Sequence, residues 1–150
     1  MTKLELMQVA LEEANAAFSQ GEVPVGAVIA RDGQILARAH NTRERDKNAL
    51  CHAEISAIDA ACRALGGWRL VGCTMYVTLE PCPMCAGAIL NAQIKHVVVG
   101  AGDEKMGAFG GLLDMRGRGL FRTNVTFGCL EEESRALMQA FFQKLRDKRE

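Results

Sequence analysis

The sequence predicts an α/β fold, in which helices alternate with the strands of a sheet. Two observations predict this class. Apolar residues recur every three or four positions in several long segments, which is the spacing of an amphipathic helix. Between these segments lie short apolar runs, often rich in valine and bounded by glycine or polar residues, which indicate buried strands. The alternation of the two patterns along the chain is typical of α/β proteins.

The first helix is predicted from Leu4 to Phe18, where apolar side chains recur at the helical spacing. Thr2 and Glu5 can form a capping box at its start, because each side chain can accept a hydrogen bond from the backbone N–H of the other residue. Gly21 is expected to end this helix.

A β-hairpin is predicted next. Residues 25–30 form an apolar run typical of a buried strand, and residues 34–39 form the second strand. Asp32-Gly33 lies between them and favours a tight hairpin turn, so the two strands are expected to be antiparallel neighbours. Residues 41–48 are polar and are expected to form a loop.

The second long helix is predicted to open at His52 and to end at Gly66-Gly67. A third strand at residues 74–79 then leads through Glu80-Pro81 into a helix that begins near Pro83. Such strand-to-helix junctions are where open α/β sheets commonly bind ligands, and the two helices are expected to lie side by side. The apolar stripe of the helix after His52 consists of Ile55, Ile58, Cys62 and Leu65.

Two more strands and a final helix are predicted in the rest of the chain. The strands are expected at residues 96–100 and 124–127. Segment 107–119 is rich in glycine and arginine and is expected to be irregular and to lie near the mouth of the site. Acidic residues 131–133 fall in the first turn of the last helix, where they offset its dipole. The apolar stripe of that helix consists of Leu137, Phe141 and Leu145.

The residues that carry chemistry lie in two short segments, His52-Ala53-Glu54 and Pro81-Cys82-Pro83-Met84-Cys85. One imidazole and two thiolates are ligands that zinc prefers, and three protein ligands leave a fourth tetrahedral position open, as in catalytic zinc sites. A helix that starts near Pro83 favours thiolates at its N-terminus. Glu54 is not needed as a ligand and is placed to move a proton. This spacing is typical of zinc-dependent nucleobase deaminases.

Other interpretations of the cysteines are weaker. A Cys-x-x-Cys pair alone is also a redox pattern, but the nearby His52 and Glu54 favour a metal. A structural zinc site needs a fourth ligand, and Cys51 would compete with His52 for the same direction. We interpret the remaining cysteines as small buried apolar residues: Cys62, Cys73 and Cys129.

Length and composition favour a single catalytic domain spanning residues 1–150. With 49% hydrophobic residues the chain can bury a core without disulfides, and 150 residues are too few for two ordinary domains. No apolar run is long enough to span a bilayer, so a membrane role has no support. The lack of an apolar N-terminal signal segment, and a metal pattern that uses two of the six cysteines, favour the reducing cytoplasm.

The formal net charge is zero, from 18 basic and 18 acidic residues, so nucleic acid could bind only through a local patch. Basic residues gather in three groups, each of which fits a solvated surface. For the group in the C-terminal tail, contact with RNA is an equal alternative. The groups are Arg43, Arg45 and Lys47; Arg116, Arg118 and Arg122; and Lys144, Arg146, Lys148 and Arg149.

The chain resembles the bacterial tRNA adenosine deaminases, a family of the cytidine deaminase-like superfamily. The resemblance runs from about Leu4 to the C-terminal helix and rests on separate segments in the same order. These segments are Glu22-Val23-Pro24-Val25-Gly26-Ala27, Ala39-His40-Asn41, His52-Ala53-Glu54, Trp68-Arg69-Leu70, Tyr76-Val77-Thr78-Leu79-Glu80-Pro81-Cys82 and Met84-Cys85-Ala86-Gly87.

The resemblance implies a three-layer α/β/α fold with a five-stranded mixed sheet, a homodimer, and one zinc ion per subunit. It implies that His52, Cys82 and Cys85 hold the zinc and that Glu54 is the proton shuttle. It also implies three contacts with the flipped base: a hydrogen bond from Asn41, the backbone of Ala53 at the polar edge of the base, and Val25 in the pocket wall. Asp103 is implied to lie near the nucleotide, and Arg122 near the RNA.

The activity that the resemblance implies is hydrolytic deamination of adenosine to inosine at the tRNA wobble position, where a single-stranded anticodon loop makes unstacking the base easy. Residues 48–51 read Asn-Ala-Leu-Cys where such enzymes carry Asp-Pro-Thr-Ala, so a deaminase of a free nucleobase or nucleoside, such as guanine, is the alternative. That enzyme would use a C-terminal aromatic lid, for which Phe141 and Phe142 are the candidates. A zinc scaffold without activity is disfavoured because Glu54 is intact.

Overall fold

One five-stranded mixed sheet forms the centre of the molecule. In this computed structural model, which describes residues 1–149, the strand order is β2-β1-β3-β4-β5. β1 pairs antiparallel with β2 and β3, whereas β3, β4 and β5 run parallel. The strands are β1 (Gly26–Arg31), β2 (Gln34–His40), β3 (Cys73–Leu79), β4 (His96–Ala101) and β5 (Asn124–Thr126).

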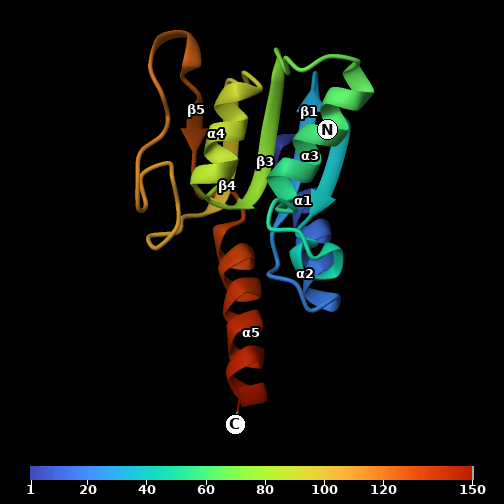
Figure 1. The fold of residues 1–150 in the computed structure, drawn as a ribbon, viewed down its shortest axis with the longest axis vertical. Coiled ribbons are helices and arrows are strands. Elements are labelled where there is room, and N and C mark those ends of the chain that lie inside the picture. The colour runs from blue at the N-terminus through green and yellow to red at the C-terminus, as the bar shows by residue number, and fades with distance from the viewer. Residues whose placement is uncertain (150) are drawn as a thin grey trace.

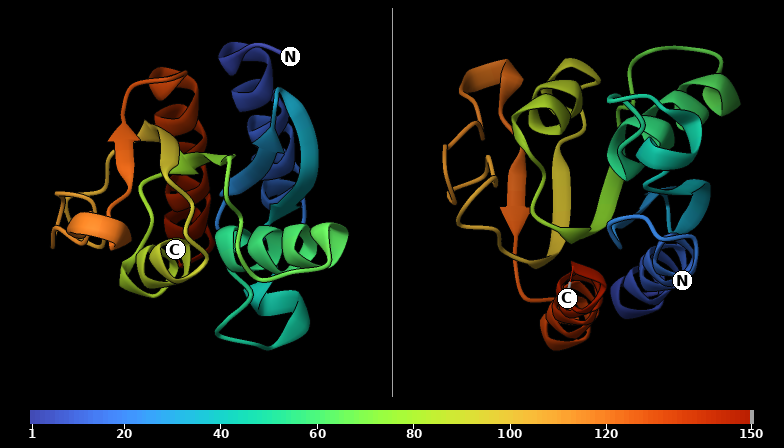
Figure 2. Two further views of the ribbon diagram at one scale, coloured as in Figure 1. Left: turned by 90° about the horizontal axis from the view of Figure 1, so that it is seen from above. Right: turned by 60° about the horizontal axis from the view of Figure 1, so that its bottom comes forward.

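Helices cover both faces of this sheet, which confirms the expected three-layer α/β/α architecture. Helices α1 (Lys3–Ser19) and α5 (Glu131–Arg149) lie on one face, and α3 (Ala53–Leu65) and α4 (Pro83–Asn91) lie on the other (Figure 1; Figure 2, left). The core is accordingly divided into two apolar clusters, one on each side of the sheet. Among residues 1–149, no helix has both the length and the apolar character needed to cross a bilayer.

The predicted start of the chain is confirmed. Thr2 accepts a hydrogen bond from the backbone N–H of Glu5, and the Glu5 carboxylate accepts one from that of Thr2, which completes the capping box.

Asp32 and Gly33 both have positive φ, 52° and 73°, as a tight turn between twisted antiparallel strands requires. The hairpin of β1 and β2 therefore follows from its local sequence.

The segment predicted as a loop at residues 41–48 contains a short helix, α2 (Arg43–Asp46), and that prediction was wrong in part. The reason lies far away in the sequence. Glu22 is buried, and its carboxylate accepts hydrogen bonds from the backbone N–H groups of Glu44 and Arg45 at 2.9 and 2.8 Å. These N–H groups belong to the first turn of α2, where they have no partner within the helix.

The predicted apolar stripe of α3 is also corrected. The fully buried residues on this helix are Ala53, Ala57 and Ala61, with Glu54 beside them. Alanine has a small side chain, so it allows the helix to approach the sheet closely. The larger residues of the predicted stripe are only half-buried at its margins: Ile55, Ile58, Cys62 and Leu65.

Two further burial predictions hold only in part. Cys73 is buried as expected, but Cys62 and Cys129 are half-buried, because they lie at the edges of the two core clusters. In α5, Phe141 is buried against Phe18, with ring centroids 6.4 Å apart. The other stripe residues, Leu137 and Leu145, are half-buried, since much of α5 extends away from the body (Figure 1).

Candidate active site

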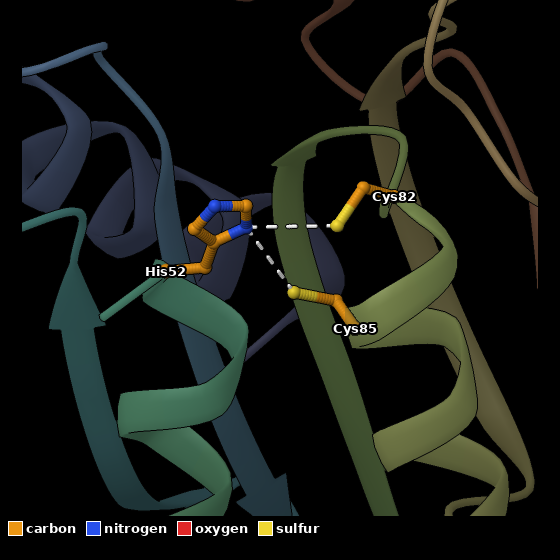
Figure 3. Close-up of side chains that lie close together, drawn as sticks. All are labelled: His52, Cys82 and Cys85. Atoms are coloured by element: carbon orange, nitrogen blue, oxygen red, sulfur yellow. Dashed lines mark hydrogen bonds between the residues drawn. The ribbon is translucent and has the colours of Figure 1, made fainter. Parts of the chain in front are cut away.

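The sheet and its two neighbouring helices bring His52, Cys82 and Cys85 together. His52 is the residue that precedes α3, and Cys82 is the residue that precedes α4; Cys85 lies in the first turn of α4. Neither His52 nor Cys82 uses its side chain to cap its own helix. Their side chains instead point at each other across the gap between the two helices (Figure 3).

The distances among these three side chains fit a tetrahedral metal. The Nδ1 atom of His52 lies 3.6 Å from the Cys82 sulfur and 3.5 Å from the Cys85 sulfur. A tetrahedral zinc with ordinary Zn–N and Zn–S bonds separates nitrogen from sulfur by about 3.6 Å. Hydrogen bonds among these atoms would be weak, because a thiol is a weak donor and acceptor, whereas one cation can contact all three atoms. The donor set therefore suits zinc.

The pKa values of the two cysteine thiols are shifted in opposite directions. Hydrogen bonding to Cys85 and to His52 lowers the pKa of Cys82 to about 4, against the opposing effect of burial. The same hydrogen bond, together with burial, raises the pKa of Cys85 far above its usual range. Hydrogen bonding to Cys82 also raises the pKa of His52. Protons must therefore leave this group before all three atoms can bind a cation.

Glu54 is a buried carboxyl group in the first turn of α3, two residues after His52. Only 4% of it is exposed, and burial raises its pKa to about 7. A carboxyl group with this pKa can both accept and release a proton near neutral pH, as general acid–base catalysis requires.

A cavity of about 200 Å³ opens beside these groups. The structure brings most of the predicted site residues to it: Val25, Asn41, His52, Ala53, Glu54, Cys82 and Asp103. Arg122 is not among the lining residues; it is exposed and directly follows a short 3-10 helix at Gly119–Phe121. Its contact with the substrate therefore stays a prediction.

Asn41 is held rigidly at the cavity wall. Its Nδ2 donates to the carbonyl oxygen of Val23 at 3.2 Å, and its Oδ1 accepts from the backbone N–H of Arg43 at 3.0 Å. An amide has a second N–H and a second lone pair, so Asn41 retains one donor and one acceptor for a ligand.

Sequence reasoning missed two buried carboxylates that shape the walls of this cavity, Glu22 and Glu80. Glu22 binds the first turn of α2, next to Asn41 and Arg43. Glu80 accepts hydrogen bonds from the backbone N–H groups of Asp103, Phe109 and Gly111. The available signal was a lone glutamate directly beside a buried apolar run, in Glu22-Val23-Pro24-Val25 and in Leu79-Glu80.

A wider groove of about 1220 Å³ continues from the cavity, with which it shares Leu79, Glu80, Asp103 and Met106. It runs between α5 and the loop of residues 102–111, which overlaps the start of segment 107–119, predicted to lie near the site mouth. Phe142 lines this groove and Phe141 is buried, so neither aromatic ring closes the small cavity. Basic side chains line the groove: Lys105, Arg135, Arg146 and Arg149.

Known deaminases are similar to this chain in sequence. Residues 1–146 match the MafB19-like deaminase family. The tRNA-specific adenosine deaminase of Bacillus subtilis is 49% identical over 99% of this chain and 94% of its own length. That of Aquifex aeolicus is 41% identical over 98% of both chains.

Solved structures agree. A structure from work on A-to-I editing by tRNA:A34 deaminases at the wobble position matches with a TM-score of 0.85 at 40% identity, over 90% of this chain and 99% of that one. The guanine deaminase of Bacillus subtilis matches less completely, with a TM-score of 0.65 at 38% identity over 68% of this chain and 66% of its own.

The fold and the cavity together define a deaminase of the cytidine deaminase-like class. The chain belongs to the MafB19-like deaminase family and to the tRNA-specific adenosine deaminases.

Proposed function

We propose that this protein converts adenosine to inosine at the wobble position of tRNA, using one zinc ion held by His52, Cys82 and Cys85. The observation that carries the proposal is the position of Glu54, a buried carboxyl group in the cavity beside His52, Cys82 and Cys85, here called the metal-binding corner. Zinc, when bound, would polarise a water molecule and lower its pKa toward neutrality.

Glu54 is the proton carrier of the reaction. It takes a proton from the attacking water and delivers protons to the ring nitrogen and to the departing amine of adenine. Its pKa of about 7 suits both directions of transfer. Adenine gains oxygen at C6 and loses ammonia, so the proton count balances without a redox partner.

The remaining cavity residues bind and orient the base. Asn41 offers its remaining donor and acceptor to the base, the backbone of Ala53 meets its polar edge, and Val25 packs against the ring. Asp103 lies where the nucleotide enters, and Arg122 contacts the RNA outside the cavity. Arg43 and Met106, which were not predicted, complete the wall.

The tRNA anticodon loop fits this site better than a free base. The groove leads from the cavity along α5 and has room for nucleotides that flank the target. Its lining includes four basic residues, Lys105, Arg135, Arg146 and Arg149, and three acidic ones, Glu80, Asp103 and Glu104. Arginine side chains in such a groove attract phosphates. The alternative, guanine deamination, is weaker, because the aromatic lid expected of it does not reach the cavity and because the curated relatives at 41% to 49% identity are tRNA-specific adenosine deaminases.

We further propose that the protein is a homodimer of single-domain subunits, each spanning residues 1–150, that acts in the cytoplasm. Exposed apolar side chains, including Leu112, Leu113, Leu120 and Phe121, offer a surface for a second copy. Light scattering at working concentration should give twice the subunit mass of 16.3 kDa. A monomeric mass would contradict the dimer and leave the chemistry unaffected.

The test of the activity is ammonia release by zinc-loaded protein on matched substrates. An anticodon stem-loop with adenosine at the wobble position is compared with the same stem-loop carrying guanosine there, and with free adenine, guanine, cytosine and their nucleosides. Turnover only of the adenosine stem-loop supports the proposal. Turnover of free guanine with an inert stem-loop would retain the zinc chemistry and replace the substrate.

A further inference from the structure

We propose that Glu80 is a positioning residue: its carboxylate holds the loop of residues 102–111 (the wall loop) at a fixed distance from the metal-binding corner, and this sets substrate affinity. The inference rests on the proposed function for its kinetic readout. Its structural readout, described below, does not depend on the substrate.

The first observation is that the buried carboxylate of Glu80 accepts hydrogen bonds from backbone N–H groups at both ends of the wall loop. Only 5% of Glu80 is exposed. Its Oε1 accepts from the N–H of Asp103 at 3.0 Å, at the start of the loop. Its Oε2 accepts from the N–H groups of Phe109 at 2.9 Å and Gly111 at 3.0 Å, at the end. Both ends of the loop are thus tied to a single side chain.

The second observation is that the loop is shaped around this carboxylate. A Cβ atom added to Gly107 would lie 2.2 Å from the Glu80 carboxyl group, and one added to Gly111 would lie 3.0 Å from its Oε2. Neither glycine has a positive φ, so backbone conformation does not explain them. Close approach to Glu80 and to the carbonyl oxygen of Asp103 does.

The third observation is the place of Glu80 in the chain. It lies two residues before Cys82, at the end of β3, and it lines the cavity itself. The loop that it holds brings Asp103 and Met106 to the wall of the same cavity. Oδ1 of Asp103 accepts hydrogen bonds from the N–H groups of Lys105 and Met106, so this turn is already rigid. The carboxylate therefore links the wall to the metal-binding corner directly.

A purely structural role for Glu80 makes a different prediction. A buried carboxylate that only satisfies loop amides would, when replaced, lower stability and reduce activity through loss of folded protein. Replacing a positioning residue should instead shift the wall loop relative to the substrate, while the metal-binding corner and Glu54 stay intact. The KM should then rise while the kcat of the folded enzyme is retained.

The structural test is amide hydrogen exchange in Glu80→Gln, with Glu22→Gln as the matched control. Glutamine retains the size of the side chain but places an N–H₂ against backbone donors. We expect exchange in peptides covering residues 102–111 to rise at least about fivefold in Glu80→Gln, with residues 41–48 unchanged. Glu22→Gln should give the reverse pattern. Equal exchange at both segments in Glu80→Gln would overturn the proposal.

The kinetic test compares Glu80→Gln, which changes the carboxylate, with Gly107→Ala, which changes the loop backbone packed against that carboxylate. Both should raise the KM for the anticodon stem-loop about tenfold, the size expected for losing a hydrogen bond to a charged group. The kcat should change less than about twofold, and zinc content should be unchanged. Leu6→Ala, in the core cluster on the other face of the sheet, serves as the control that lowers stability without touching the cavity.

The outcomes separate the two proposals. A fall in kcat with loss of zinc, or an unchanged KM in both variants, would overturn the role of Glu80. If wild-type protein does not act on the stem-loop, the proposed substrate fails, and the hydrogen-exchange pattern alone then decides whether Glu80 holds the wall loop.

Discussion

At the scale of single residues, the chemistry depends on where two helices begin. His52 and Glu54 come from the start of α3, and Cys82 and Cys85 come from the start of α4. Helix N-termini present unpaired N–H groups and a partial positive charge, which favour thiolates and carboxylates. Burial acts in the opposite direction on Glu54 and prevails, which leaves this carboxyl group able to carry a proton near pH 7.

The role of Glu54 predicts the effect of Glu54→Gln. Glutamine has nearly the same shape but cannot carry the proton, so turnover of the stem-loop should fall by about 10²- to 10⁴-fold. Zinc content, measured by atomic absorption, and the thermal midpoint should stay close to wild type. Glu12→Gln, on the exposed face of α1, is the control and should retain full activity. Substantial activity in Glu54→Gln would exclude the proposed proton path.

The unequal thiols predict that zinc uptake releases protons. Near neutral pH the Cys82 thiol is already ionised, whereas Cys85 retains its proton and His52 is more readily protonated than a free imidazole. Metal binding needs all three atoms deprotonated, so added protons compete with zinc and affinity should fall as the pH is lowered from about 8 to about 6. Competition with a chromophoric chelator measures this. Cys129→Ser, away from the cavity, should give the same curve, and an affinity independent of pH would contradict the assignment.

At the scale of elements, the success of sequence reasoning depended on how local each interaction is. The capping box of Thr2 and Glu5 and the turn at Asp32-Gly33 involve neighbours in the chain, and both were predicted. The buried face of α3 was not, because alanines such as Ala57 are fully buried there, whereas the larger Ile58 packs only at the margin of the core cluster.

The candidate site shows the same division. The juxtaposition of His52, Cys82 and Cys85 was predictable, since their spacing places them at two helix starts. The carboxylates Glu22 and Glu80 were not, because their partners lie 22 to 31 residues away and are backbone N–H groups, which have no signature in the sequence.

The contact of α1 with β1 depends on Gly26. A Cβ atom there would lie 1.9 Å from the carbonyl oxygen of Ala10. Gly26→Ala should therefore lower the free energy of unfolding by about 2 to 3 kcal/mol, as overpacking in a core commonly does. Urea unfolding measures the change. Gly87→Ala, inside α4 with open space at the Cβ position, should instead be neutral or stabilising by up to about 1 kcal/mol. Equal effects of the two substitutions would contradict this packing.

At the scale of the whole molecule, the proposed function places one base in the cavity and the neighbouring nucleotides in the groove along α5. The neutral overall charge provides no long-range attraction, so the arginines of the groove must supply the phosphate contacts. This arrangement reconciles a balanced composition with an RNA substrate.

The groove predicts the behaviour of the double substitution Arg146→Gln with Arg149→Gln. The Kd for the stem-loop should rise about tenfold at moderate salt, and the slope of log K against log salt should decrease by about 1 for each phosphate that the variant no longer neutralises. Fluorescence anisotropy over a salt series measures both. Arg63→Gln, which removes an exposed arginine of α3 paired with Asp59, is the control. An unchanged slope would place the RNA elsewhere.

Among the residues of α5 that the structure describes, only Ser134 and Phe141 are buried, and the C-terminal part of the helix extends away from the sheet (Figure 1). This end of the helix can therefore be modified without disturbing a packed side chain. A fluorophore attached at the exposed position of Lys148 would sit beside the basic groove. Such a labelled enzyme would serve as an optical sensor that reports the arrival of RNA before any base is converted.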